Sequence, residues 1–366
     1  MKTQQKGYKQ MVAKARLKRY RHFAKMFQYN NDDFIYTTSW KSLSVQSKFD
    51  EKLKCLWREK EEKGLFRYTY KIEKLIKLPG KYEFPAVLNT DRGTKRRKPI
   101  TFASVLEPFN EDLFNFTKVN PEEYLFKFTN VSSDCFDTND TLAINASPLG
   151  DFHSLILPKI NCKFPQVINE CALNVSIQLL LLSASPTIRV GFNSLCAFAS
   201  VNHLHLHLYY LPHKMYLETC DIEKLSGPCY TIVDFPSKGF VFILKPNDPL
   251  SDFVKEIFIL VDYLQKNNIP HNIYITRALN KDLNTTDLTN TRNCVRVFVW
   301  ARYPSGDKCM DKFAPATCEL FGHLVFKDKS EFSEISEHSV SQILTDVTES
   351  SFLSIVNDVK NLYLNL

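Results

Sequence analysis

The sequence is poor in glycine, and it lacks the glycine patterns that bind nucleotide phosphates. Only 10 of its 366 residues are glycine, and none of them forms a GxGxxG or GxxxxGK[ST] pattern. Their absence argues against a Rossmann or P-loop nucleotide site. No apolar run approaches the roughly 20 residues that a membrane-spanning helix needs, and the N-terminus lacks the apolar stretch of a secretory signal.

Closely spaced cysteine pairs are also missing, although the chain contains ten cysteines. Zinc sites and disulfide frameworks depend on clustered cysteines, so we interpret these residues as free thiols in a reducing compartment. We therefore expect a cytoplasmic protein without a bound metal. The alternative location is the mitochondrion, because the N-terminus is basic and weakly amphipathic.

Acidic residues are absent from the first 25 positions, which contain nine Lys or Arg. This segment accounts for the formal net charge of +7, because the rest of the chain holds 38 basic and 40 acidic side chains. A run of like charges repels itself and is typical of a solvated arm. We expect residues 1–40 to form a basic, disordered tail, and we expect no nucleic-acid or membrane partner for the body of the protein.

Hydrophobic periodicity predicts a mixture of helices and short strands. Helices are expected over residues 44–63, 166–182 and 251–266, where apolar side chains recur every three or four positions, and the last forty residues add two more. Strands are expected over residues 65–78, 84–89, 142–146, 154–158, 188–192, 200–211, 239–244, 271–277 and 294–302. Because helices and strands do not alternate regularly, this order favours an α+β fold with an antiparallel sheet.

One segment stands out chemically: NHLHLHL, residues 202–208, has histidine at alternate positions. In a strand, His203, His205 and His207 would point to one face and the leucines to the other. Three imidazoles around a common space suit nucleophilic attack on phosphorus, in which the flanking rings hold the phosphoryl oxygens. A zinc site and an ordinary polar strand face are the alternatives.

The text around this segment, RVGFNSLCAFASVNHLHLHLYYL (residues 189–211), resembles the GDP-hexose phosphorylase family of the histidine-triad (HIT) superfamily. That family includes animal GDP-D-glucose phosphorylases and plant GDP-L-galactose phosphorylases. Further blocks match in order: GLFRYTY (64–70), KLPGKYEFPAVLN (77–89), RRKP (96–99), FNFTKV (114–119), INASPL (144–149) and CELFGHL (318–324). The resemblance spans about residues 45–330.

The resemblance implies an α+β fold with a HIT-like antiparallel sheet, flanking helices and two HIT-like lobes. The catalytic lobe with the triad is expected over residues 41–240, and a second lobe without a triad over 241–330. C-terminal helices are expected over residues 331–366. The sequence does not predict an oligomeric state.

The resemblance also implies a reaction, in which GDP-D-glucose and inorganic phosphate give GDP and glucose 1-phosphate. His205, the middle histidine, would attack the α-phosphorus and hold GMP covalently until phosphate displaces it, and His203 and His207 would assist. No cofactor is implied. Substrate contacts are expected from Lys118, Asn145, His153, Asn193 and Ser200.

Several of these residues have structural alternatives. Asn145 precedes Ser147-Pro148 and also suits a turn, and Asn193 also suits a cap at a strand end. The basic residues between positions 92 and 97 fit a solvated turn better than a substrate contact, so Lys118 is the preferred candidate for phosphate.

The chain departs from the family pattern at four positions. It has Val87 where the family has Gln, Phe152 and Cys196 where it has Gly, and Leu208 where it often has a small residue. Loss of glycine places a side chain where the backbone makes a tight turn or approaches a ligand. The third triad position, His207, is histidine in animal GDP-glucose phosphorylases and also in HIT hydrolases. A nucleoside diphosphate-sugar hydrolase that uses water therefore stays open as an alternative, and so does a pseudoenzyme that binds guanine nucleotides without turnover.

Overall fold

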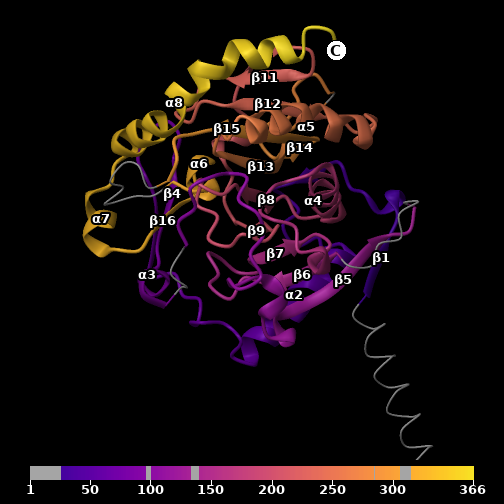
Figure 1. Cartoon of the computed structure of the whole chain (residues 1–366), viewed down its shortest axis with the longest axis vertical. Coiled ribbons are helices and arrows are strands. Elements are labelled where there is room, and N and C mark those ends of the chain that lie inside the picture. Colours follow the sequence, from indigo (N-terminus) through magenta and orange to yellow (C-terminus); the bar gives the residue numbers. More distant parts are fainter. Residues whose placement is uncertain (1–25, 96–99, 133–139, 284, 306–314) are drawn as a thin grey trace, which may run out of the picture.

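The computed structural model describes residues 26–95, 100–132, 140–283, 285–305 and 315–366, and one long sheet runs through the molecule (Figure 1). Its eleven strands lie in the order β1 (Met26–Tyr29), β5 (Tyr124–Asn130), β6 (Thr141–Ile144), β7 (Ser154–Leu157), β9 (Leu206–Tyr210), β8 (Ile188–Asn193), β13 (His271–Ala278), β15 (Cys294–Ala301), β12 (Phe240–Leu244), β11 (Cys229–Ile232) and β10 (Ile222–Ser226). Apart from the parallel pair of β1 and β5, neighbouring strands are antiparallel. The expected α+β class with an antiparallel sheet is confirmed.

Each half of the sheet repeats one arrangement of three strands, a helix and two further strands. In the first half β5, β6 and β7 precede α4 (Glu170–Leu182), and β8 and β9 follow it. In the second half β10, β11 and β12 precede α5 (Leu250–Lys266), and β13 and β15 follow it. The halves join where β8 pairs with β13, so the molecule has two lobes within one sheet. Residue 240, where the boundary between the lobes was expected, is the first residue of β12. Because β12 pairs with β11, this residue lies inside the second half of the sheet.

The two faces of the sheet are covered differently. Apolar side chains of α2 (Lys48–Glu62), α4 and α5 pack on one face and form the largest core cluster. The other face is covered by α6 (Thr317–Leu320), α7 (Lys329–Glu334) and a small sheet of β3 (Lys74–Lys77), β4 (Pro85–Leu88) and β16 (Leu324–Phe326). The long helix α8 (Glu337–Leu362) lies along the β10 end and contributes to both cores (Figure 1).

Outside these layers, β2 (Thr38–Ser39) pairs with β14 (Thr291–Arg292), and the short helix α3 (Thr90–Lys95) follows β4. None of the helices in the described ranges combines the length and the apolar character that crossing a membrane requires.

The disordered tail expected over residues 1–40 does not include residues 26–40. Residues 1–25 lie outside the described residues, but residues 26–40 are folded, with β1 paired to β5 and Trp40 buried. The Phe27 ring packs against Phe49 and Phe126 at centroid distances of 5.8 and 5.9 Å. This apolar contact, which charge counting did not consider, attaches the segment to the first lobe.

The strand expected over residues 200–211 is also shorter, because it begins at Leu206. Before it, the Gln166 side chain takes the place of a neighbouring strand. Its Oε1 accepts the His205 backbone N–H at 2.9 Å, and its Nε2 donates to the His205 carbonyl at 3.0 Å. The first two histidines of the triad therefore lie in a loop, and the expectation that all three rings share one strand face is wrong.

Cys196 and Phe152 stand where the family pattern has glycine, and both have left-handed backbone conformations, with φ of 60° and 61°. A side chain in this region costs roughly 1–2 kcal/mol per residue relative to right-handed backbone. The two glycine positions expected from the family resemblance are thus positions where glycine would fit without strain.

We expect the free energy of unfolding to be about 1 kcal/mol higher for Cys196→Gly than for Cys196→Ala, so that the glycine variant is the more stable. Both variants lose the thiol, and only alanine keeps the strained Cβ. Urea unfolding of the two variants, followed by tryptophan fluorescence, measures this difference. An alanine variant as stable as the glycine variant would show that the conformation carries no strain.

Candidate active site

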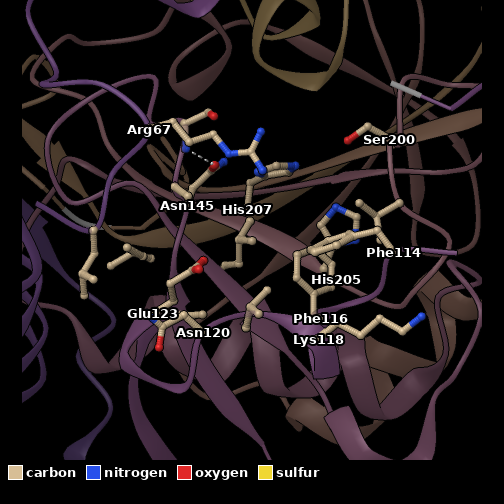
Figure 2. Close-up of a pocket in the computed structure, with 18 of the residues that line it drawn as sticks. Arg67, Phe114, Phe116, Lys118, Asn120, Glu123, Asn145, Ser200, His205 and His207 are labelled. Carbon is tan, nitrogen blue, oxygen red and sulfur yellow. Dashed lines mark hydrogen bonds between the residues drawn. The ribbon is translucent and has the colours of Figure 1, made fainter. Parts of the chain in front are cut away.

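Two adjoining cavities, of about 340 Å³ and 300 Å³, share the four residues Arg92, Ser200, His205 and His207. We call them cavity A and cavity B. The wall of cavity A, drawn in Figure 2, includes Leu65, Arg67, Phe114, Phe116, Lys118, Asn145 and Ser147. The wall of cavity B includes Phe102, Asn193, Cys196, Tyr209, Cys318, Glu319 and Lys327. Two histidines of the triad thus lie where the cavities meet.

The His205 ring has a defined tautomer. Its Nδ1 lies 2.8 Å from the His203 carbonyl oxygen, which can only accept, so Nδ1 carries the proton. In the neutral ring, Nε2 then has a free lone pair. The ring packs on Phe116 at 4.9 Å, and Figure 2 shows both side chains at the cavity wall. This arrangement presents a nucleophilic nitrogen at the junction of cavities A and B.

The His207 tautomer is set by a chain of hydrogen bonds through His153. The Leu149 backbone N–H donates to His153 Nδ1 at 2.9 Å, so the His153 proton is on Nε2. That Nε2 has two neighbours, His207 Nδ1 at 3.1 Å and Asn145 Nδ2 at 3.2 Å. Because the Asn145 Oδ1 is held by the Ser147 N–H at 3.0 Å, the amide presents its NH2 group, and only His207 can accept. His207 therefore carries its proton on Nε2, as a donor.

His203 has both ring nitrogens bonded to backbone. Its Nδ1 accepts the Phe116 N–H at 3.1 Å, and its Nε2 donates to the Ile160 carbonyl at 3.1 Å. The ring is buried and lines neither cavity A nor cavity B. Its carbonyl, however, fixes the His205 tautomer, so His203 supports the site through its backbone and by anchoring the loop.

The triad rings and His153 are neutral at neutral pH. Burial lowers the pKa of His205 to about 4 and that of His203 to about 4. Burial also holds the pKa of His207 and His153 well below the usual range, and the positive charge of Arg92 lowers both further. A neutral His205 is the form that can attack phosphorus.

The other residues expected to contact substrate lie at different places. Asn145 and Lys118 line cavity A, Asn193 lines cavity B, and Ser200 lines both. The Lys118 ammonium is held by the carbonyls of Asp112 and Leu113 at 3.3 and 3.1 Å, and by that of Glu111. His153 lines neither cavity and reaches the site through His207.

Sequence reasoning missed several residues that line the cavities. Arg92, which was assigned to a solvated turn, lines both cavities and donates to the Ser147 carbonyl. Arg67 lines cavity A on the side of Asn145 and His207 (Figure 2). Arg67 lies within a block that resembles the family, residues 64–70, and Arg92 follows another, residues 77–89. In the basic segment around Arg92, the sequence alone does not show which side chain points into the protein. Within the described ranges, no group of three or more His, Cys, Asp or Glu side chains is arranged to hold a metal ion.

Comparison with known proteins identifies the family of this chain. The model described as "GDPGP1-like, N-terminal domain" matches residues 48–209, and "GDPGP1-like, C-terminal domain" matches residues 213–365. The chain belongs to the GDPGP1-like family. GDP-D-glucose phosphorylase 1 of Danio rerio is 42% identical over 326 residues, 87% of this chain and 92% of that protein. The Homo sapiens protein of that name is 37% identical over 308 residues, 82% of this chain and 80% of its own length.

Among solved structures, yeast Ap4A phosphorylase Apa2 in complex with Ap4A matches 83% of this chain and 98% of its own, with a TM-score of 0.57. At 15% identity this likeness concerns the fold alone, which the two chains share over most of their length.

We expect His153→Phe to lower the kcat of the reaction expected for the family by about 100-fold, because phenylalanine has no N–H to fix the His207 tautomer. His153→Gln keeps an N–H donor and should lose less. Nitrogen-15 NMR of the His207 ring measures the tautomer directly and separates this effect from unfolding. A folded phenylalanine variant with an unchanged His207 tautomer and unchanged kcat would contradict the assignment.

Proposed function

We propose that this chain is a GDP-D-glucose phosphorylase, which converts GDP-D-glucose and inorganic phosphate into GDP and glucose 1-phosphate. The proposal rests on the relatives of that name and on one observation in this chain. That observation is the neutral His205 ring, whose Nδ1 proton is bound to the His203 carbonyl at 2.8 Å and whose Nε2 is thereby left as a nucleophile where two cavities meet.

The reaction takes place in two steps at the α-phosphorus. In the first step His205 Nε2 forms a bond to phosphorus, the bridging P–O bond breaks, and glucose 1-phosphate leaves with the bridging oxygen. In the second step a phosphate oxygen attacks the same phosphorus, the P–N bond breaks, and GDP leaves with His205 again neutral. His207 Nε2–H donates to the phosphoryl or leaving oxygen in both steps, where negative charge develops.

The two cavities suit the two parts of the substrate. Cavity A offers the Phe114 and Phe116 rings and the Asn145 amide, which fit a purine base and a ribose. Cavity B offers the Asn193 amide NH2 group, which can donate a hydrogen bond to a hexose hydroxyl, and the Glu319 carboxylate, which can accept one. Arg92 lines both cavities, and its guanidinium can bind the phosphates that span them. The proposal includes a cytoplasmic location, because the described cysteines are free thiols.

Mass spectrometry of the intact protein tests the nucleophile. The wild-type chain mixed with GDP-glucose in the absence of phosphate should gain the mass of one GMP group and release glucose 1-phosphate. His205→Asn should form no adduct and lose at least about 1,000-fold in turnover, since covalent catalysis needs the imidazole. When phosphate is added, GDP should appear. Release of GMP would indicate hydrolysis instead, and a fully active asparagine variant would exclude His205 as the nucleophile.

A second variant tests the phosphate contact. Arg92→Gln should lower kcat/KM by about 100-fold, because the charge that faces the transferred phosphate is lost. Lys95→Gln is the matched control, since Lys95 lies on the same short helix but pairs with Asp91 at 2.9 Å and is exposed. Steady-state kinetics with GDP-glucose measures both. Equal losses in the two variants would show a general effect of charge rather than a contact by Arg92.

A further inference from the structure

A third cavity, of about 280 Å³, lies apart from the catalytic residues. We call it cavity C. It shares only Leu149 with cavity B and no residue with cavity A, and neither His205 nor His207 lines it. Its size is close to the lower end of the usual range for small-molecule sites, about 300–1,000 Å³. The catalytic reaction described above does not use it.

His323, which lines cavity C, is a buried imidazole without a hydrogen-bond partner. Its side chain is 3% exposed, and neither ring nitrogen has a partner among the described residues. The other buried histidines that the structure describes each use at least one ring nitrogen: His153, His203, His205 and His271. A buried polar group without a hydrogen-bond partner destabilises the protein, so a ligand that bonds to His323 would remove this destabilisation.

The position of the His323 ring is fixed by the fold. The residue lies between α6 and β16, and its backbone N–H donates to the Cys318 carbonyl at 2.9 Å. The ring stacks on His213, which also lines cavity C, with 6.4 Å between centroids and 19° between planes. Two imidazoles are therefore held together at one part of the cavity wall.

The charges around these imidazoles favour a negative group. Burial lowers the pKa of both His213 and His323, the latter to about 3. The positive charge of Arg189, which is paired with the buried Glu218, lowers both pKa values further. Lys54 also lines the cavity. The acidic side chain in the wall, Asp151, is bound to Arg58 at 3.1 Å. A carboxylate at the imidazoles would accept hydrogen bonds from them in a favourable potential.

The remaining wall of cavity C is apolar. Leu43, Ile72 and Leu75 are 52%, 40% and 40% exposed, and all three line the cavity. Val87 and Leu211 line it deeper, where they are buried. Exposed large apolar side chains gathered at one cavity favour an apolar occupant.

We propose that cavity C is a second ligand site, which binds a small amphipathic carboxylate with its anionic group at His323 and His213 and its apolar body against the leucine-lined wall. Leu149 separates this site from cavity B, and its backbone N–H is the first donor in the hydrogen-bond chain to His207. A bound ligand would thus lie directly beside the segment that orients the catalytic histidines.

Titration of the full chain with sodium benzoate, followed by nitrogen-15 NMR of the histidine rings, tests the site. Benzoate should shift the His323 and His213 signals and leave the His205 signal in place. Benzyl alcohol, which has the same ring without the charge, should bind at least about tenfold more weakly. Absence of a His323 shift, or equal binding of the two probes, would overturn the proposal.

Two substitutions localise the binding. His323→Phe should weaken benzoate binding by at least about tenfold. Leu75→Asp should also weaken benzoate binding, because it places a carboxylate at the cavity without altering the imidazoles. This variant provides the test if His323→Phe does not fold. Leu353→Asp is the control, since Leu353 is 62% exposed on α8 and does not line the cavity. Unchanged benzoate binding in Leu75→Asp would overturn the proposal. Sedimentation provides a second check. If the wild-type chain is a dimer and Leu75→Asp dissociates it, a second copy of the chain covers the cavity, and the proposal is overturned.

Discussion

The Asn193 side chain ends β8 at the line where the first lobe meets the second, and its oxygen accepts three hydrogen bonds from the second lobe. The donors are Asn272 Nδ2 at 2.7 Å, Thr317 N at 3.0 Å and Thr317 Oγ1 at 2.6 Å. A Cβ on Gly191 would lie 3.0 Å from the Thr317 methyl group, so glycine allows α6 to approach β8 this closely. This contact brings Glu319 into the same cavity as His205, although the two residues come from different lobes.

Within the site, backbone groups decide where protons lie. Carbonyl and amide groups of the main chain fix the tautomers of His203, His205 and His153. His153 in turn fixes the tautomer of His207 through the hydrogen bond between their rings. The result is one imidazole that offers a lone pair and a neighbour that offers a proton. The chemistry therefore depends on loops that are positioned by hydrogen bonds, and only the last triad residue belongs to a strand.

The fold class, most helices and most strand cores could be predicted from the sequence because hydrophobic periodicity reports burial directly. The spacing of the histidines also predicted a reactive site. It did not reveal that the His203 ring binds backbone groups, because these groups, the Phe116 N–H and the Ile160 carbonyl, are distant in sequence. The inward turn of Arg92 was equally hidden, since it depends on the Ser147 carbonyl from another segment. Local sequence patterns predict helices, strands and candidate site residues. Hydrogen bonds between distant segments determine which of these residues point into the site.

The burial that keeps these imidazoles neutral has a cost for the whole molecule. Burial lowers the pKa of His203, His205 and His271 to about 4, and that of His323 to about 3. The unfolded chain takes up protons at these rings near their ordinary pKa of about 6.5, whereas the folded chain does not. Acidification from that value towards the folded pKa values therefore favours unfolding, and each such ring adds about 1.4 kcal/mol per pH unit to the loss. The burial that keeps these rings neutral at neutral pH therefore also makes the folded protein sensitive to acid.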